Sequence, residues 1–245
     1  MKKKIRQLLH LFKKKAAPTP IQSSEKIHHP FSALPLRPDE VRLVIDVGAF
    51  TGWYTVQAAR SYPNATIVSF EPTDESAKQF LINTTIYSSR IQFHPIGLSD
   101  NAGEAIINLT TTGGANSVHP QSHEHRRQNP HVVECGKQKI ILRTLDDVLQ
   151  KTSGVIDVLK IDVEGFELNV LRGAKASLAR TKFVILEVAL SRDHNVKNQN
   201  VFGIFEFLQQ ANFHLYSIID IYRFDEPHPI LGMAQFDAIF CHNDL

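Results

Sequence analysis

The stretch from Leu43 to Thr55 constrains the fold of this chain more than any other. Its apolar and β-branched residues run into Asp46, and Gly48 and Gly52 follow before a segment compatible with a helix. A strand, a glycine turn and a helix in this order are typical of an open α/β sheet, where glycines let backbone N–H groups approach a ligand at the end of the strand. The stretch therefore predicts a nucleotide-like ligand, although its spacing matches neither a dinucleotide fold nor a P-loop. A purely structural turn is the alternative.

A second unit of the same kind follows. A strand over residues 65–70 ends in Glu71, 19 residues after Gly52, which is the span of one helix and one strand. An acid at that point can accept hydrogen bonds from a ribose diol, or it can cap the next helix. With a helix over 76–86 and a third strand over 91–100, three such units predict a parallel sheet with right-handed crossovers.

The second half of the chain continues the alternation. An apolar strand over residues 156–161 delivers Asp162 and Glu164 to its carboxyl end. The other elements that we expect are a short strand over 106–109, ordered structure from 140–143, a helix over 167–178, a strand over 183–188 that ends in an acid, a well-buried helix over 201–211 and an antiparallel β pair formed by 213–219 and 236–241.

Charge and proline content divide the chain into a basic tail with a proline-rich linker, residues 1–39, and a folded domain, residues 40–245; a proline-rich segment laid across the domain is the alternative to a linker. Residues 1–15 carry seven Lys or Arg and no acid, whereas the rest holds 20 basic against 25 acidic residues. An acidic body argues against a nucleic-acid surface. The tail has apolar residues at helical spacing, which predicts peripheral contact with an anionic membrane surface; a solvated, frayed terminus is the alternative. Those apolar residues are Ile5, Leu8, Leu9 and Phe12.

The cysteine and histidine patterns favour a reducing compartment and no metal centre. Cys135 and Cys241 are far apart in the sequence and form no C-x-x-C pair, so we expect a cytoplasmic protein, in peripheral contact with the inner face of the membrane if the tail binds it. Residues 119–135 are rich in histidine but also contain prolines, and they lack the tight ligand pairs of zinc sites. We predict a polar loop there, suited to act as a lid over a substrate.

Five sequence blocks in order resemble the FkbM family of S-adenosylmethionine-dependent methyltransferases. The blocks are Val-Ile-Asp-Val-Gly-Ala-x-x-Gly, Phe-Glu-Pro, Gly-Leu-Ser-Asp, Thr-Leu-Asp-Asp and Leu-Lys-Ile-Asp-Val-Glu-Gly-Phe-Glu, and the resemblance covers roughly residues 43–190. It implies a Rossmann-like class I methyltransferase, an α/β fold with a seven-stranded, mostly parallel sheet and an antiparallel C-terminal strand. It also implies S-adenosylmethionine as the cofactor.

The resemblance assigns roles to residues at the strand ends. In the order of the chain, Asp46, Gly48 and Gly52 would line the methionine end of the cofactor, Glu71 would take the ribose hydroxyls, Ser99 and Asp100 would lie near the adenine, and Asp162 and Glu164 would border the methyl group and the acceptor. The chain departs from the family at Phe50, where Asn is usual, so a polar side chain near the amino-acid end of the cofactor is missing.

These assignments lead to an expected reaction, O-methylation of a hydroxyl on a glycan, a lipid-linked sugar or a secondary metabolite. The acceptor must lose its proton, and Asp162 at the strand end is the favoured base. Glu164 would orient Asp162, bind substrate or hold a divalent ion with it; in an extended chain the two point to opposite faces. Asn116 and His119 are candidate acceptor contacts. The alternatives are a non-catalytic membrane-associated protein that keeps the fold and, disfavoured by the missing third glycine, a nicotinamide dehydrogenase.

Overall fold

The structure, a computed structural model, describes residues 30–120, 126, 130–189, 201–222 and 235–245. The predicted amphipathic tail, most of the linker, and His123 and His125 lie outside these residues. Phe31 and Leu34, which the sequence assigns to the linker, are buried in the core beside Tyr62. The folded part of the chain therefore begins before residue 40.

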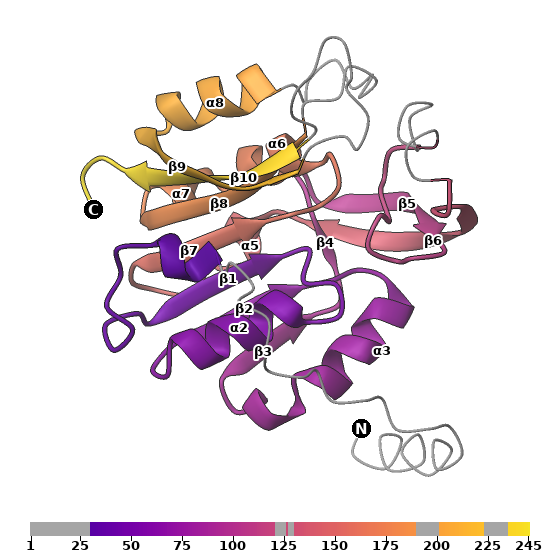
Figure 1. Ribbon diagram of the computed structural model, residues 1–245, viewed down its shortest axis with the longest axis horizontal. Coiled ribbons are helices and arrows are strands. Elements are labelled where there is room, and N and C mark those ends of the chain that lie inside the picture. Colours follow the sequence, from indigo (N-terminus) through magenta and orange to yellow (C-terminus); the bar gives the residue numbers. More distant parts are fainter. Residues whose placement is uncertain (1–29, 121–125, 127–129, 190–200, 223–234) are drawn as a thin grey trace.

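A seven-stranded sheet forms the centre of the protein, in the order β3-β2-β1-β7-β8-β10-β9 (Figure 1). Strand β10 is antiparallel to both of its neighbours, and the other neighbouring pairs are parallel, as predicted. The strands are β1 (Leu43–Val47), β2 (Thr66–Phe70), β3 (Ile91–His94), β7 (Ile156–Ile161), β8 (Thr181–Ala189), β9 (Phe213–Tyr222) and β10 (Gln235–His242).

Both faces of this sheet are buried, because successive side chains of a strand point to opposite sides. In β1, for example, Ile45 and Val44 belong to two different core clusters. One cluster includes residues of α2 and η1, and the other includes residues of α6, α7 and α8. The helices are η1 (Pro30–Ala33), α2 (Trp53–Ser61), α3 (Asp74–Asn83), η2 (Thr85–Tyr87), α5 (Leu145–Val148), α6 (Glu167–Arg172), α7 (Lys175–Leu178) and α8 (Val201–Gln210).

A second, three-stranded sheet, here called the accessory sheet, has the order β4-β6-β5 and extends to the right of the main sheet in Figure 1. Its strands are β4 (Gly97–Leu98), β5 (Gly103–Thr110) and β6 (Glu134–Arg143). The third strand predicted over 91–100 is therefore two strands in different sheets, separated at Pro95, which has no N–H to donate to a ladder.

Two predictions about this region were wrong in extent. Strand β5 is longer than the predicted 106–109, and β6 begins at Glu134, inside the segment that the sequence assigns to a loop. The reason lies in burial: most of β6 is exposed, and its buried positions, such as Ile140 and Leu142, alternate with outward-facing residues only near its end. A strand with mostly polar, exposed residues lacks the apolar alternation by which sequence reveals strands.

The helix predicted over 167–178 is interrupted at Gly173 and forms α6 and α7. A Cβ added at Gly173 would lie 2.0 Å from the carbonyl oxygen of Ser99, so the loop after β4 packs directly against the backbone at this break. Only glycine permits so close an approach.

Helix α8 is less buried than its apolar composition predicts. Ile204 and Leu208 are buried, but Phe202 is 78% exposed. The helix packs against the main sheet with one side, so only residues three or four apart reach the core. None of the described helices is both long and apolar enough to cross a membrane.

Candidate active site

The glycine turn after β1 brings two strand ends into direct contact. Gly48 has a φ of 78°, and a Cβ added there would lie 1.7 Å from the carbonyl oxygen of Asp162. The amide of Asp162 in turn donates to the carbonyl of Val47 at 3.0 Å. A side chain at residue 48 would therefore separate the ends of β1 and β7, so the glycine fixes the position of Asp162 as well as the shape of the turn.

Glu71, at the end of β2, is buried and hydrogen-bonded. Its carboxylate accepts from the amide of Phe50 at 3.1 Å and from the amide and hydroxyl of Thr73 at 2.9 and 2.5 Å. Burial raises the pKa of Glu71 above its ordinary value, although these hydrogen bonds and the charge of Lys160 oppose the shift. Glu71 thus contacts the residue before α3 and also lines the pocket described next, so both interpretations made from the sequence are compatible with its position.

A pocket that is partly open to solvent lies at the carboxyl ends of β1, β2 and β7. Five of the predicted site residues line it: Gly48, Glu71, Asn116, Asp162 and Glu164. The other five, Asp46, Gly52, Ser99, Asp100 and His119, are not part of its wall.

The accessory sheet supplies an apolar side of this pocket. Ile107, Ile140 and Leu142 form a small buried cluster of that sheet, and all three line the pocket together with Ile96 and Leu98. These residues had no role in the sequence analysis. They could not be recognised there, because the accessory sheet itself was only partly predicted.

Asp46 lies beneath the pocket wall and is paired within the protein. It is 2% exposed, accepts a hydrogen bond from the hydroxyl of Thr55 at 2.6 Å, and lies 3.6 Å from the ammonium of Lys160. The same ammonium lies 3.1 Å from Asp162, donates to the carbonyl of Gly48 at 3.3 Å, and sits 4.2 Å from the centre of the Tyr54 ring. Lys160 therefore joins the glycine turn to the end of β7.

Lys160 remains charged although it is buried. Burial lowers its pKa, but the charges of Asp162 and Asp46 outweigh this effect and hold the pKa above its ordinary value. Lys160 was not among the site residues predicted from the sequence. A lysine inside the apolar strand that ends at Ile161 was the available signal, and its partner Asp46 is its register neighbour on β1.

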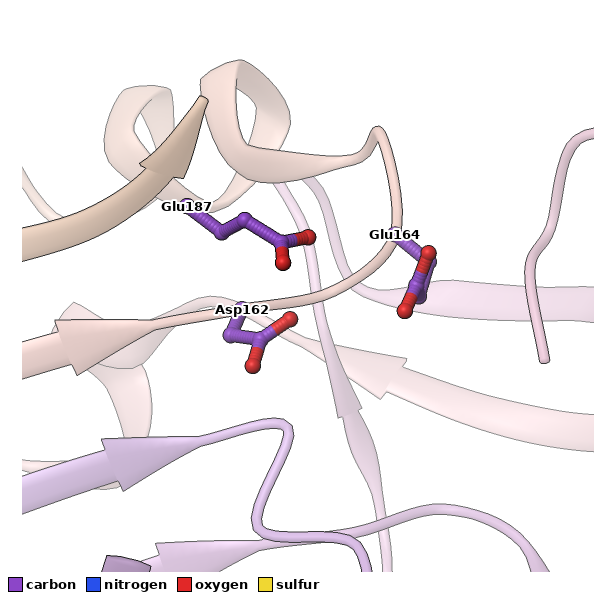
Figure 2. Close-up of side chains that lie close together, drawn as sticks. All are labelled: Asp162, Glu164 and Glu187. Carbon is purple, nitrogen blue, oxygen red and sulfur yellow. The ribbon is translucent and has the colours of Figure 1, made fainter. Parts of the chain in front are cut away.

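Three carboxylates meet at the ends of β7 and β8 (Figure 2). Asp162, Glu164 and Glu187 each offer one oxygen, and these oxygens lie within 4.8 Å of one another; we call them the acid cluster. In an extended chain, Asp162 and Glu164 would point in opposite directions, as predicted from the sequence. That condition does not hold, because β7 ends at Ile161 and Glu164 adopts a left-handed φ of 54°. Both side chains line the same pocket.

Crowding changes the protonation of the acid cluster. Burial, followed by the charges of Asp162 and Glu167, raises the pKa of Glu164 well above its ordinary value. Burial and the charge of Asp162 do the same for the pKa of Glu187, which also accepts a hydrogen bond from Gln235 at 2.9 Å. Like charges this close cannot all persist, so the cluster is suited to hold a proton or a divalent cation, for which carboxylate oxygens are good ligands.

Glu167, the first residue of α6, closes the turn that carries Glu164. One of its oxygens accepts from the amides of Val163 and Gly165 at 3.2 and 3.0 Å. Burial raises the pKa of Glu167 to about 7, against the lowering effect of these hydrogen bonds. The carboxylate thus satisfies backbone donors that precede a helix.

Ser99 and Asp100 form a compact turn outside the pocket wall. Ser99 donates to Asp100 at 2.9 Å, and Asn169 of α6 donates to the same carboxylate at 3.4 Å. Burial raises the pKa of Asp100, but these hydrogen bonds outweigh it and lower the pKa below its ordinary value. The residues just before this turn, Gly97 and Leu98, do line the pocket.

Residues 110–119, here called the strap, cross the pocket. Asn116 lines it, but its side-chain oxygen already accepts from the amide and hydroxyl of Thr110 at 2.7 and 3.2 Å. His119 packs against the ring of Phe166 at 5.6 Å between centroids, and burial lowers its pKa. The ring of Phe50 lies against the strap, and a Cβ added at Gly113 would be 3.0 Å from it.

The order of the seven strands, with an antiparallel β10 between β8 and β9 and a pocket at the strand ends, defines a class I methyltransferase fold. A solved structure, the methyltransferase FkbM from Methylobacillus flagellatus, is similar with a TM-score of 0.51 and 16% identity over 83% of this chain and 45% of that chain. The chain belongs to the FkbM methyltransferase domain family, whose model matches residues 46–215.

Curated relatives share about a quarter of their aligned residues with this chain. The 2-O-methyltransferase NoeI of Sinorhizobium fredii is 26% identical over 67% of this chain and 70% of its own length. Methyltransferase 1 of Beauveria bassiana is 28% identical over 56% of this chain and 59% of its own length. The AMB antimetabolite synthetase AmbE of Pseudomonas aeruginosa is 29% identical over 64% of this chain, which spans only 9% of that protein.

Proposed function

We propose that the protein is an S-adenosylmethionine-dependent O-methyltransferase that acts on a hydroxyl of a glycan, a lipid-linked sugar or a secondary metabolite. The observation that carries the proposal is that one pocket is lined by Gly48, Glu71, Asp162 and Glu164 together. Family membership supports methyl transfer, and a relative named as a 2-O-methyltransferase supports oxygen as the methylated atom.

The pocket fits the cofactor in chemistry. Glu71 is an acid at a strand end, and three hydrogen bonds use three of the roughly four acceptor positions of a carboxylate, which leaves capacity for a ribose hydroxyl. The apolar side formed by Leu98, Ile140 and Leu142 suits a purine ring. We assign the methionine end to the turn at Gly48. When bound, the cofactor supplies a methyl group that is already activated for transfer.

The chain's own task is to hold the acceptor and take its proton. The sequence favoured Asp162 as the base, but its carboxylate is already paired with the ammonium of Lys160 at 3.1 Å. Glu164 lines the same pocket and has a raised pKa. We therefore assign the proton transfer to Glu164, which accepts the hydroxyl proton as the acceptor oxygen gains the methyl group, and the orientation of the acceptor to Asp162.

Transfer of tritiated methyl from S-adenosylmethionine to a pool of glycans and lipids from cells that lack the protein tests this function. We expect transfer by the natural chain and a loss of roughly 10²–10⁴-fold in Glu164→Gln. Transfer should rise with pH through the raised pKa of Glu164, since only the carboxylate accepts a proton, and Glu164→Gln should lose that rise. Glu104→Gln, at an exposed ion pair with Lys139, is the matched control and should be fully active.

Calorimetry with S-adenosylmethionine separates the alternatives. Absence of cofactor binding by the folded protein would overturn the proposal. Binding without transfer to any acceptor pool would instead favour the non-catalytic alternative that keeps the fold.

For the acid cluster we propose a proton rather than a resident metal ion. Lys160 already pairs with Asp162, and Gln235 already donates to Glu187, so two of the three carboxylates have protein partners. We expect methyl transfer to be unchanged after dialysis against EDTA. Loss of activity that Mg²⁺ or Mn²⁺ restores would assign a divalent cation to the cluster.

The predictions about nucleic-acid and membrane partners rest on the sequence alone. The acidic body supports the absence of a nucleic-acid partner. Contact of residues 1–15 with an anionic membrane surface and a cytoplasmic location stay predictions. Co-sedimentation with anionic vesicles, compared before and after deletion of these residues, tests the membrane contact.

A further inference from the structure

The strap is anchored to the accessory sheet at Ser117. The amide of Asn108 in β5 donates to the carbonyl of Ser117 at 2.8 Å, and the amide of Ser117 donates back at 3.2 Å, which forms an antiparallel bridge. The side-chain amide of Asn108 donates a second hydrogen bond to the carbonyl of Ser117 at 3.1 Å. The backbone of Ser117 is therefore held in place by the strand, independently of the pocket.

The hydroxyl of Ser117 joins this anchor to the turn after β7. It donates to the backbone carbonyl of Glu164 at 2.7 Å and accepts from the amide of His119 at 3.1 Å. A carbonyl can only accept and an amide can only donate, so the single hydroxyl hydrogen has one orientation that satisfies both partners. This contact joins residues that are 47 positions apart in the sequence.

Glu164 needs such support because its backbone is unusual. It adopts a φ of 54°, a region that residues other than glycine visit rarely and that persists only where the surroundings enforce it. Glu167 holds the amides on either side, at Val163 and Gly165, whereas Ser117 holds the carbonyl of Glu164 itself. The carbonyl of Glu164 and the amide of Gly165 belong to the same peptide plane, so Ser117 and Glu167 hold that plane from its two edges.

We propose that Ser117 is a positioning residue for methyl transfer, which keeps the Glu164 carboxylate in the pocket wall through the hydrogen bond to its carbonyl. This rests on the function proposed above, with Glu164 as the proton acceptor. The accessory sheet would then have two functions, since it forms the apolar wall of the pocket and also holds the turn that carries Glu164. The hydroxyl touches neither cofactor nor acceptor in this assignment, so its effect passes entirely through Glu164.

The transfer assay with the glycan and lipid pool tests the role of Ser117. In Ser117→Ala we expect kcat to fall roughly 3- to 10-fold, the worth of one hydrogen bond, with calorimetric cofactor affinity and acceptor KM within about 2-fold. Ser117→Thr keeps the hydroxyl and should restore most of kcat. Thr112→Ala, an exposed strap residue, is the control and should match the natural chain. In a Glu164→Gln background, Ser117→Ala should have no further effect.

Hydrogen exchange distinguishes this proposal from the proposed function. In Ser117→Ala the amides of Val163 and Gly165 should exchange faster than in the natural chain, whether or not the acceptor pool is methylated. Unchanged exchange in these amides, or an equal loss of kcat in the Ala and Thr variants with both proteins folded, would overturn the positioning role. An inactive natural chain with accelerated exchange in Ser117→Ala would overturn the function and leave the structural link supported.

Discussion

The two sides of the pocket are built in opposite ways. On the side of the glycine turn, the carboxylate of Glu71 accepts three hydrogen bonds from Phe50 and Thr73, which lie close to it in the fold. On the other side, the acid cluster crowds three carboxylates from two strand ends, and Glu164 carries an unusual backbone conformation. The carboxylate of Glu71 is therefore suited to bind a ligand without a change in its own protonation. The acid cluster is suited to gain and lose a proton.

Lys160 connects the two sides. Its ammonium contacts the carbonyl of Gly48 on one side and the carboxylate of Asp162 on the other. Because one buried cation contacts both groups, the position of the glycine turn and the position of the Asp162 carboxylate depend on each other. The following changes disturb one side at a time, in order of decreasing expected effect.

The largest effect is expected from Gly48→Ala. The added Cβ would lie 1.7 Å from the carbonyl of Asp162, at a φ of 78° that disfavours alanine. We expect the free energy of unfolding to fall by more than about 4 kcal/mol, or folding to fail. Urea unfolding followed by circular dichroism measures this. Gly103→Ala, where an added Cβ meets nothing within 4 Å, is the control, and equal stability of the two variants would contradict the prediction.

Lys160→Met removes the cation between the two sides. Buried Asp46 and Asp162 then lose their counter-charge, which should lower the free energy of unfolding at pH 7 by about 3–5 kcal/mol. Urea unfolding at pH 7 tests this. Lys139→Met, in an exposed pair with Glu104, should change stability by less than about 1 kcal/mol; a loss equal to that of Lys160→Met would refute the argument.

Glu167→Gln tests how the carboxylates near the end of β7 change stability with pH. The folded-state pKa of about 7 lies above the ordinary 4.5, so the folded state binds more protons and stability falls as pH rises between these values. The contribution is on the order of 3 kcal/mol. Glutamine can still accept from the amides of Val163 and Gly165 but does not titrate. Its unfolding free energy should therefore decline less from pH 5 to 8; parallel curves for the two proteins would show that the charge is not responsible.

Phe50→Asn, which introduces the residue that the family resemblance predicts at this position, should have the smallest effect. The hydrogen bond to Glu71 comes from the backbone amide and survives the change, and asparagine tolerates the φ of 47° well. The better fit of asparagine to this φ stabilises the variant, and the loss of the contact between the Phe50 ring and Gly113 offsets that stabilisation. We expect stability within about 1 kcal/mol and cofactor affinity within roughly 3-fold of the natural chain. Calorimetry with S-adenosylmethionine checks the affinity, and a change beyond about 10-fold would give Phe50 a direct role.

The glycine side was largely predictable because its signals are local. A strand, a glycine turn, a helix and an acid after the next strand are adjacent in the chain, and the structure has each of these elements where it was predicted. The antiparallel C-terminal pair was predicted for the same reason, since two β-type runs close the chain. Short-range pattern was enough to identify the sheet and its family.

The acid side could be predicted only in part. Asp162 and Glu164 follow a strand and were found, but Glu187 joins them through the pairing of β7 with β8, and Lys160 meets Asp46 through the pairing of β7 with β1. The left-handed backbone of Glu164 reversed the expected direction of its side chain, and no short sequence pattern announces such a conformation in a residue other than glycine.

The sequence by itself thus determined the main sheet, the glycine turn and the acids at the strand ends, because strand periodicity, glycine and strand-end charge act over a few neighbouring residues. Only the tertiary structure decided which charges share one space, that Lys160 lies between them, and that Ser117 of the strap supports the turn after β7. The physical reason is that burial and the distance between charges fix protonation, and both depend on how distant segments pack.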